Sequence, residues 1–243
     1  MTEDVGPAGT PVLRWSPDPA VVGLSAFETI EDNVGRTEPG VAHILVEGDH
    51  YRFDMDIAQR DPVAGSTARD RQRNEVAGMV QDGVTQIIGL GETWRITYSM
   101  FIPATLQPTS RFTHIMQMKR PGLGSLPLVT TSLRQGGPSG QLLVLDAYDA
   151  GITVAATDLL PLQEHWIDAQ IDVVVGTSGA LGWKLSMDGR SVVAGRRSGV
   201  NIWLPPRLWP KFGIYRSTLD ESALLETYLL IRDLRAYQIF TTA

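Results

Sequence analysis

Apolar and polar residues alternate with a period of two along most of the chain. In segment 94–102 the alternate positions that begin at Trp94 are apolar, whereas those that begin at Arg95 are polar. Segments 167–175 and 183–188 alternate in the same way. Successive side chains of a strand point to opposite faces, so this pattern predicts β-strands with one buried and one polar face.

Turn residues separate these segments from further short runs of strand-forming residues. Asp188-Gly189 predicts a tight hairpin turn. Segment 221–230 also fits a helix, but it runs directly into an alternating segment, and we expect most of it to be strand. Further strands are predicted at 41–46, 50–57, 72–78, 112–119, 127–134, 141–148, 191–194, 211–217 and 227–239. About twelve strands with turns between them predict an all-β, two-sheet sandwich.

The sequence shows no internal repeat and no linker. Residues 1–20 are rich in Pro, Gly and Asp, and we expect an N-terminal arm or a loose first strand there. Residues 21–243 are predicted to form a single domain, since β-sandwiches of this length commonly fold as one unit. The 24 glycines and 15 prolines agree with a fold of many turns.

Charge and composition exclude several functions. The net charge of −6 argues against non-specific nucleic-acid binding, which needs a broad basic surface, but it permits a local basic groove for an anionic ligand. The absence of cysteine excludes disulfides and thiolate chemistry. The sequence as given shows no signal peptide and no apolar run long enough to span a membrane. We expect a soluble monomer; its natural location stays open, and a secreted precursor is compatible with the sequence.

Three predicted strands carry an unusual set of polar side chains opposite an apolar face. The strands contain RNEV at 73–76, HIMQMK at 114–119 and WPKFGIYR at 209–216. Their alternation places on one face Arg73, Glu75, Gln117, Lys119, Lys211 and Tyr215, and on the other Val76, Met116, Met118, Phe212 and Ile214. Solvated sheet faces also carry Lys, Arg and Glu, but an amide, a phenol and several cations on three strands favour a functional groove. Simple alternation places His114 on the apolar face, and a β-bulge would reverse this.

These three segments resemble the strand motifs of jelly-roll polysaccharide lyases. In alginate lyases of this fold the motifs run approximately R-[ST]-E-[LV], Q-[IV]-H and Y-F-K-x-G-x-Y, and the wider group includes glucuronan lyases and heparin lyase I. The resemblance spans about residues 41–240 and implies a β-jelly-roll sandwich of the concanavalin A-like type. Two departures concern the substrate: Lys119 stands where the alginate lyases have His, and Ser217 stands where they have Gln. A glucuronan or another polyuronate is therefore as compatible as alginate.

The resemblance implies cleavage of a uronate-containing polysaccharide by β-elimination. Tyr215 would shuttle the proton between C5 of the uronate and the leaving oxygen, because nearby cations favour a phenolate. Amide and cationic donors would stabilise the charge that develops at the uronate carboxylate. The expected catalytic residues are Arg73, Gln117, Lys211 and Tyr215. The expected substrate-binding residues are Glu75, Lys119, His114, Trp209 and Arg216.

Two other functions stay open at this stage. A non-catalytic carbohydrate-binding jelly roll would use the same groove. A glycoside hydrolase is less favoured, because no spacing places two carboxylates on one strand face around a glycosidic bond. We expect no required cofactor, although a structural calcium held by Asp and backbone oxygens is compatible with the sequence.

Overall fold

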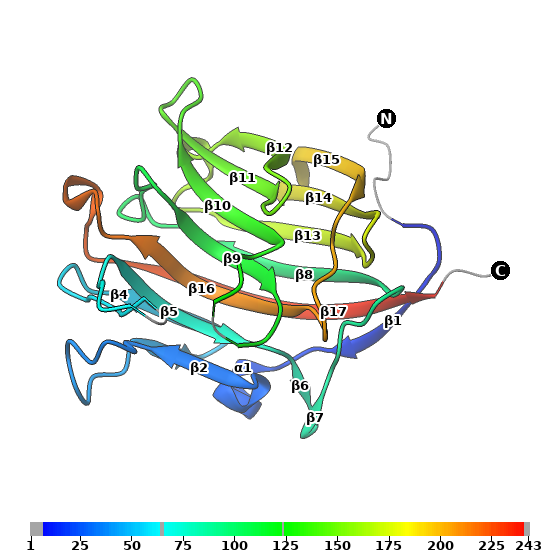
Figure 1. Cartoon of the computed structure of the whole chain (residues 1–243), viewed down its shortest axis with the longest axis horizontal. Helices are drawn as coiled ribbons and strands as arrows, with labels where there is room; N and C mark the ends of the chain where they lie inside the picture. Colours follow the sequence, from blue (N-terminus) through cyan, green and yellow to red (C-terminus); the bar gives the residue numbers. More distant parts are fainter. Residues whose placement is uncertain (1–6, 64–65, 123, 241–243) are drawn as a thin grey trace.

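Two antiparallel sheets pack face to face in the computed structural model (Figure 1), which describes residues 7–63, 66–122 and 124–240. The sheet here called sheet A has the order β15 (Arg190–Val200), β14 (Gly179–Met187), β13 (Trp166–Val174), β8 (Thr93–Phe101), β17 (Thr227–Phe240), β4 (His50–Met55) and β3 (Ile44–Glu47), and β1 (Thr10–Trp15) also pairs with β17. The other, sheet B, has the order β12 (Ile152–Asp158), β11 (Gln141–Ala147), β10 (Val129–Gln135), β9 (Thr113–Lys119), β16 (Trp209–Ser217), β5 (Arg71–Ala77) and β2 (Thr29–Asp32).

The remaining elements are short. Strands β6 (Val80–Gln81) and β7 (Val84–Thr85) form a hairpin, which Figure 1 shows below the sheets beside α1 (Pro19–Val22). Three single 3₁₀ turns are η1 (Gly23–Ala26), η2 (Leu160–Leu162) and η3 (Glu221–Ala223). Among the described residues no helix is long and apolar enough to cross a membrane. The all-β, two-sheet sandwich predicted from the alternation is confirmed, as is the jelly-roll type that the resemblance implies.

The core fills the space between the inward faces of the two sheets. Met116, Met118, Phe212 and Ile214 of sheet B are fully buried there, on the side that the alternation predicts. The ring of Phe212 meets that of Tyr98 from sheet A edge to face, with their centroids 5.4 Å apart. Because the apolar face of sheet B packs in the core, its polar face points outward.

Every strand predicted from the alternation overlaps an observed one, and the Asp188-Gly189 turn joins β14 to β15 with both residues at positive φ, as expected of a tight hairpin. Besides the short strands β6 and β7, the prediction missed β2 and β12, the two edge strands of sheet B. Neither edge strand has a regularly alternating burial pattern, so neither carries the signal used. Segment 221–226 is not strand, because η3 occupies its start and β17 begins at residue 227.

The described part of the N-terminal segment forms a first strand, one of the two possibilities expected for it, and not an arm. Strand β1 pairs with the end of β17, and Trp15 at its end is fully buried, 6.3 Å from Phe212 between ring centroids. Residues 10–15 therefore belong to the sandwich, while residues 1–6 lie outside the described part of the chain.

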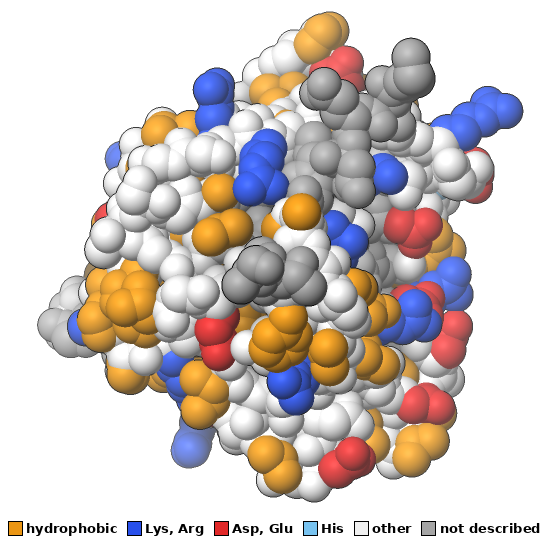
Figure 2. Space-filling view, turned by 90° about the vertical axis from the view of Figure 1, so that its right-hand side faces the viewer, with side chains coloured by type: hydrophobic (Ala, Val, Ile, Leu, Met, Phe, Trp, Pro, Cys, Tyr) orange, Lys and Arg blue, Asp and Glu red, His pale blue; other side chains and the backbone are white. Residues whose placement is uncertain are grey.

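Figure 2 shows the end of the molecule at the right of Figure 1, where basic, acidic and hydrophobic side chains are interspersed.

Candidate active site

The outward face of sheet B carries a cleft of about 570 Å³. Strands β5, β16 and β9 lie side by side under it, and loops around Val34, Val63 and Leu126 form parts of its wall. Antiparallel pairing sets Arg73 opposite Tyr215 and Lys211 opposite Gln117. The structure thus brings the four residues expected to be catalytic to one cleft.

A buried network of ion pairs lies at the base of this cleft. Lys211 Nζ donates to Glu31 Oε2 at 2.5 Å and to Glu75 Oε2 at 2.8 Å, and Gln117 Nε2 donates to Glu75 Oε1 at 2.6 Å. Arg73 reaches the same two carboxylates, with Nη1 3.3 Å from Glu31 and Nε 3.4 Å from Glu75. Glu75, at 1% exposure, does not line the cleft. It orients the amide and the cations above it and is not placed to contact substrate.

The charges of this network shift one another's pKa values. Burial acts to raise the pKa of Glu31, but Lys211 and Arg73 outweigh it and hold that pKa below its usual value. Burial acts in the opposite sense on Arg73, whose pKa is nevertheless raised by Glu75 and Glu31. Both groups therefore stay ionised at neutral pH, and much of the positive charge of Arg73 and Lys211 is already compensated by carboxylates.

Tyr215 is surrounded by cationic and aromatic side chains. Its phenolic oxygen lies 2.6 Å from Nη1 of Arg71, which donates a hydrogen bond to it. The guanidinium of Arg73 lies over its ring, 4.2 Å from the centroid, and the ring of Phe112 packs at 4.8 Å. A hydrogen bond from a cation favours the ionised form of a phenol. This arrangement suits a tyrosine that must accept and return a proton.

His114 lines the cleft instead of the core face that simple alternation predicts. A bulge in β9 is responsible: Met116 pairs with Thr131 and His114 with Ser132, so two residues of β9 match one of β10. The consecutive residues Ile115 and Met116 both enter the core, and His114 is turned to the outward side. The ring centroid of His114 lies 6.0 Å from that of Tyr215.

The surroundings of His114 keep its imidazole neutral. Burial, assisted by the positive charge of Arg134, lowers the pKa of His114 to about 3. Its Nδ1 lies 2.7 Å from Ser132 Oγ, which itself donates to Thr130 Oγ1. Nδ1 is therefore assigned the proton, and Nε2 is the unprotonated nitrogen. A neutral imidazole here can accept a hydrogen bond from a sugar hydroxyl, but it offers no positive charge to a carboxylate.

Lys119 lines the cleft two residues beyond Gln117, in the position predicted for it. Burial lowers its pKa, and the nearby charges of Lys211 and Arg73 act in the same sense. Among the described residues, no hydrogen bond or ion pair joins its ammonium group to a partner. Lys119 is thus the cation of this cleft whose charge is most available to an incoming anion.

Three residues expected to bind substrate do not line the cleft: Glu75, which lies in the buried network at its base, and Arg216 and Trp209. Arg216 follows Tyr215 by one residue, so strand alternation turns it inward, where it is fully buried and donates to Gln72 Oε1 at 2.6 Å. Burial lowers its pKa to about 10. Trp209 is 7% exposed, and its indole nitrogen donates to Glu28 at 3.3 Å. The side chains of Arg216 and Trp209 both have structural partners away from the cleft.

Three contributors were missed by the sequence reasoning. Arg71 precedes Arg73 by two residues and shares its face, so the alternation that singled out Arg73 could have found it. Phe112 lies just before β9 and packs against Tyr215. Glu31 belongs to the edge strand β2, which carries no clear periodic signal. Its role depends on a pairing with β5 that only the fold reveals.

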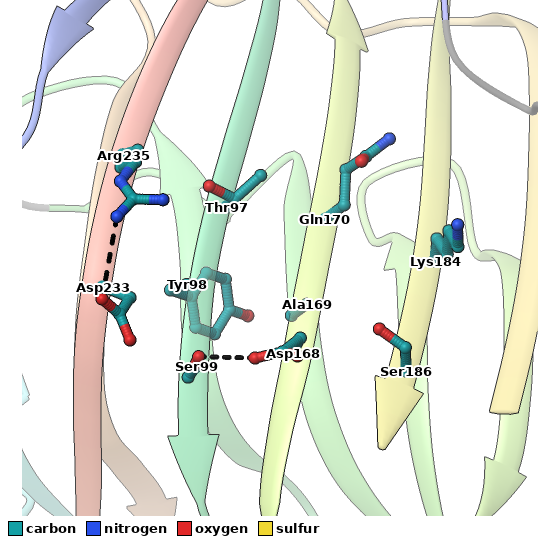
Figure 3. A pocket seen from close by; sticks show the side chains of 10 residues that line it. All are labelled: Thr97, Tyr98, Ser99, Asp168, Ala169, Gln170, Lys184, Ser186, Asp233 and Arg235. Atoms are coloured by element: carbon teal, nitrogen blue, oxygen red, sulfur yellow. Dashed lines mark hydrogen bonds and ion pairs between the residues drawn. The ribbon is translucent and has the colours of Figure 1, made fainter. Parts of the chain in front are cut away.

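A second hollow, of about 420 Å³, lies on the outward face of sheet A (Figure 3). Its polar side chains are partly tied to one another, since Ser99 Oγ donates to Asp168 at 2.6 Å and Arg235 lies 3.8 Å from Asp233. The ring of Tyr98 at its base is buried in the core. Within the described ranges no three His, Asp or Glu side chains gather as metal ligands would, and the structural calcium stays a prediction.

Comparison with known proteins gives matches in structure only. No family model matches the sequence, and no curated protein matches it either. An alginate lyase from Pseudomonas aeruginosa superposes with a TM-score of 0.56 at 18% identity, over 88% of this chain and 98% of that one. An endo-β-1,4-glucuronan lyase from Trichoderma reesei gives 0.53 at 13% identity, over 93% and 95%. The catalytic domain of a glycoside hydrolase family 131 protein from Coprinopsis cinerea gives 0.52 at 13%, over 77% and 69%.

At these identities the likeness establishes the fold and leaves the chemistry to the residues of the cleft. Enzymes of two reaction classes, lyases and a hydrolase, share this architecture. The chain has the jelly-roll sandwich fold of the alginate and glucuronan lyases.

Proposed function

We propose that this protein is a polysaccharide lyase that cleaves a uronate-containing acidic polysaccharide by β-elimination in the cleft of sheet B. The observation that carries the proposal is the placement of Tyr215: its oxygen accepts a hydrogen bond from Arg71, and its neighbours in the same cleft include Arg73, Gln117 and Lys119. A phenol among cations, beside an amide, combines a proton shuttle with donors for an anionic sugar.

The reaction requires these two functions together. The base removes the proton from C5, the C–H electrons form the C4=C5 double bond, and the C4–O bond breaks. Negative charge develops on the carboxylate side of the sugar during this step, and preorganised donors stabilise it. Gln117, held by Glu75, and Arg73 line the same cleft as the base and can donate to the carboxylate, while Lys119 supplies a cation that no ion pair holds among the described residues.

Tyr215 can serve as both base and acid. As a phenolate it takes the C5 proton; as the resulting phenol it returns that proton to the leaving oxygen, when both lie on the same side of the sugar ring. Neutral His114 is placed close enough to Tyr215 to help orient a sugar hydroxyl. The ion pairs of Lys211 assign it to holding Glu31 and Glu75 in place.

Hydrolysis agrees less well with this cleft. A glycosidase of the usual kind needs two carboxyl groups free to flank the scissile bond. Here Glu75 is buried and shared by Gln117 and Lys211, and Glu31 is held by Lys211 and Arg73. The third carboxylate, Asp61, is 2% exposed and accepts hydrogen bonds from two backbone amides and the Gln59 side chain.

A substrate screen tests the proposal. Polyglucuronate, alginate and heparin-type chains are incubated with the protein at several pH values, and the ultraviolet absorbance of the unsaturated product is followed together with new reducing ends. A lyase raises both signals equally. New reducing ends without absorbance would show a hydrolase, and binding with neither signal would show a carbohydrate-binding module; either result would overturn the proposal.

A further inference from the structure

Arg71 makes the most direct contact with the oxygen of Tyr215. Its Nη1 lies 2.6 Å from the phenolic oxygen, whereas its Nε donates to Asp70 Oδ1 at 2.8 Å. Arg71 lies on β5 opposite Ser217. This pair is two residues along the strands from the directly opposed pair Arg73 and Tyr215. Arg71 thus reaches Tyr215 diagonally and meets the end of the phenol, where the proton is bound.

The second arginine lies mainly over the ring of the tyrosine, although the charge of Tyr215 and a hydrogen bond to it also help to raise the pKa of Arg73. Arg73 lies over the ring at 4.2 Å from its centroid, and its charge is shared with Glu31 and Glu75. Arg71 has one carboxylate partner, Asp70, whose side chain is one-third exposed and therefore partly screened by water. Of the two, Arg71 is better placed to stabilise negative charge on the phenolic oxygen.

The other groups around Tyr215 do not supply an equivalent contact. The remaining charged or titratable side chains that line the described part of the cleft are Glu31, Asp61, His114, Lys119, Tyr148 and Lys211. His114 is neutral, and Lys211 is held by Glu31 and Glu75. No hydrogen bond joins any of these six to the phenolic oxygen within the described residues.

We propose that Arg71 is a positioning residue that stabilises negative charge on the phenolic oxygen of Tyr215, the group that acts as the base. This inference rests on the proposed elimination. Arg71 gains and loses no proton in the cycle: the C5 proton passes to the phenolate oxygen and then to the leaving oxygen, after which the ionised phenol is restored against the guanidinium. Substrate specificity is left to the other cations of the cleft.

The variants R71M and R71K separate charge from geometry. R71M removes the cation and the donor, while R71K keeps a cation that can still reach the oxygen. R111M is the matched control: it removes one positive charge from an exposed residue next to Phe112, outside the cleft lining. Thermal unfolding of each variant shows first that it is folded.

The first readout is the pH dependence of kcat/KM on the polymer that the parent cleaves. A neighbouring cation shifts a titrating group by about one to three pH units. We therefore expect the rise in activity with pH to move upward by at least about one unit in R71M, which lowers the rate at neutral pH about tenfold or more. R71K should recover most of the shift, and R111M should stay close to the parent.

The second readout needs no activity. Ionisation of tyrosine is followed by ultraviolet difference absorbance, and the part of the titration lost in Y215F belongs to Tyr215. Two of the six tyrosines stay out of the window, because burial raises the pKa of Tyr98 to about 12 and raises that of Tyr51 as well. The Tyr215 component should move to higher pH in R71M.

The outcomes distinguish the two proposals. If R71M is folded and both the titration of Tyr215 and the pH profile stay where the parent has them, or move no further than in R111M, the role of Arg71 is overturned. If the titration moves as expected but no polymer is cleaved by the parent, the lyase proposal fails and the coupling between Arg71 and Tyr215 stands.

Discussion

Glu75→Gln is the substitution that most directly perturbs the base of the cleft. The glutamate accepts from Gln117 on one oxygen and from Lys211 on the other, and it is 1% exposed. A glutamine of the same shape has one acceptor oxygen and one amide donor, so one of these two donors must face another donor. The variant also leaves Lys211 with a single carboxylate partner, Glu31.

The expected cost follows from this geometry. Breaking a buried ion pair by removing one partner costs about 3–5 kcal/mol, and we expect about 3 kcal/mol, because Glu31 still compensates Lys211. In a domain of this size that loss lowers Tm by about 6–12 °C. The control E221Q removes the carboxylate of an exposed pair with Arg60 and should change the free energy of unfolding by less than about 1 kcal/mol.

Chemical denaturation of E75Q, K211M and the double variant measures this. The free energy of unfolding of the double variant should fall by less than the sum of the two single losses, with a coupling energy of about 0.5–3 kcal/mol. The reason is that the double variant removes both members of the pair, so neither buried charge is left without the other. A loss in E75Q no larger than in E221Q, or additive losses in the double variant, would refute the reasoning about the buried network.

Three further substitutions test other parts of the account. Arg216→Met should lower stability by about 1–3 kcal/mol, since a buried donor to Gln72 is lost, and leave KM unchanged, which steady-state kinetics and denaturation will show together. Gly213→Ala should cost at least about 1–3 kcal/mol in the same denaturation assay, because Gly213 has φ of 129° and a Cβ there would lie 2.2 Å from the backbone oxygen of Asn74. His114→Gln should flatten part of the pH dependence of stability. With a pKa of about 3 in the fold and about 6.5 in the unfolded chain, this histidine takes up its proton mainly on unfolding, so its contribution falls as pH is lowered from about 6.5 towards 3, by at most about 1.4 kcal/mol per pH unit. A parent-minus-variant difference that does not change with pH would contradict this.

Strand alternation was enough to predict the sandwich and the face on which Arg73, Gln117, Lys211 and Tyr215 lie. The reason is physical: a sheet with one buried side sorts its residues by parity, and that sorting is written directly in the sequence. The same rule places Arg216 inward, so its assignment to the substrate was an error of application, and it also points to Arg71, which the reasoning passed over.

Other features could not be read from the chain. The bulge that turns His114 into the cleft depends on how β9 pairs with β10, and pairing is a property of two strands together. Glu31 contributes through an edge strand that is barely periodic. The burial of Trp209 depends in part on Glu28, which is distant in sequence and accepts a hydrogen bond from its indole nitrogen. Long-range pairing thus decided the parts of the site that local pattern left open.

The central claim is that Tyr215 transfers the proton in an elimination reaction, and the Tyr215→Phe variant tests it most directly. The measurement is the rate at which unsaturated product appears from the best polyuronate substrate, with glycan binding measured on the same preparation. Tyr237→Phe, which removes a phenol far from the cleft on β17, is the control. The account predicts a loss of about a hundred- to ten-thousand-fold in kcat with binding nearly intact, as expected when a general acid–base group is removed. A Tyr215→Phe variant whose kcat matches that of the control would contradict it.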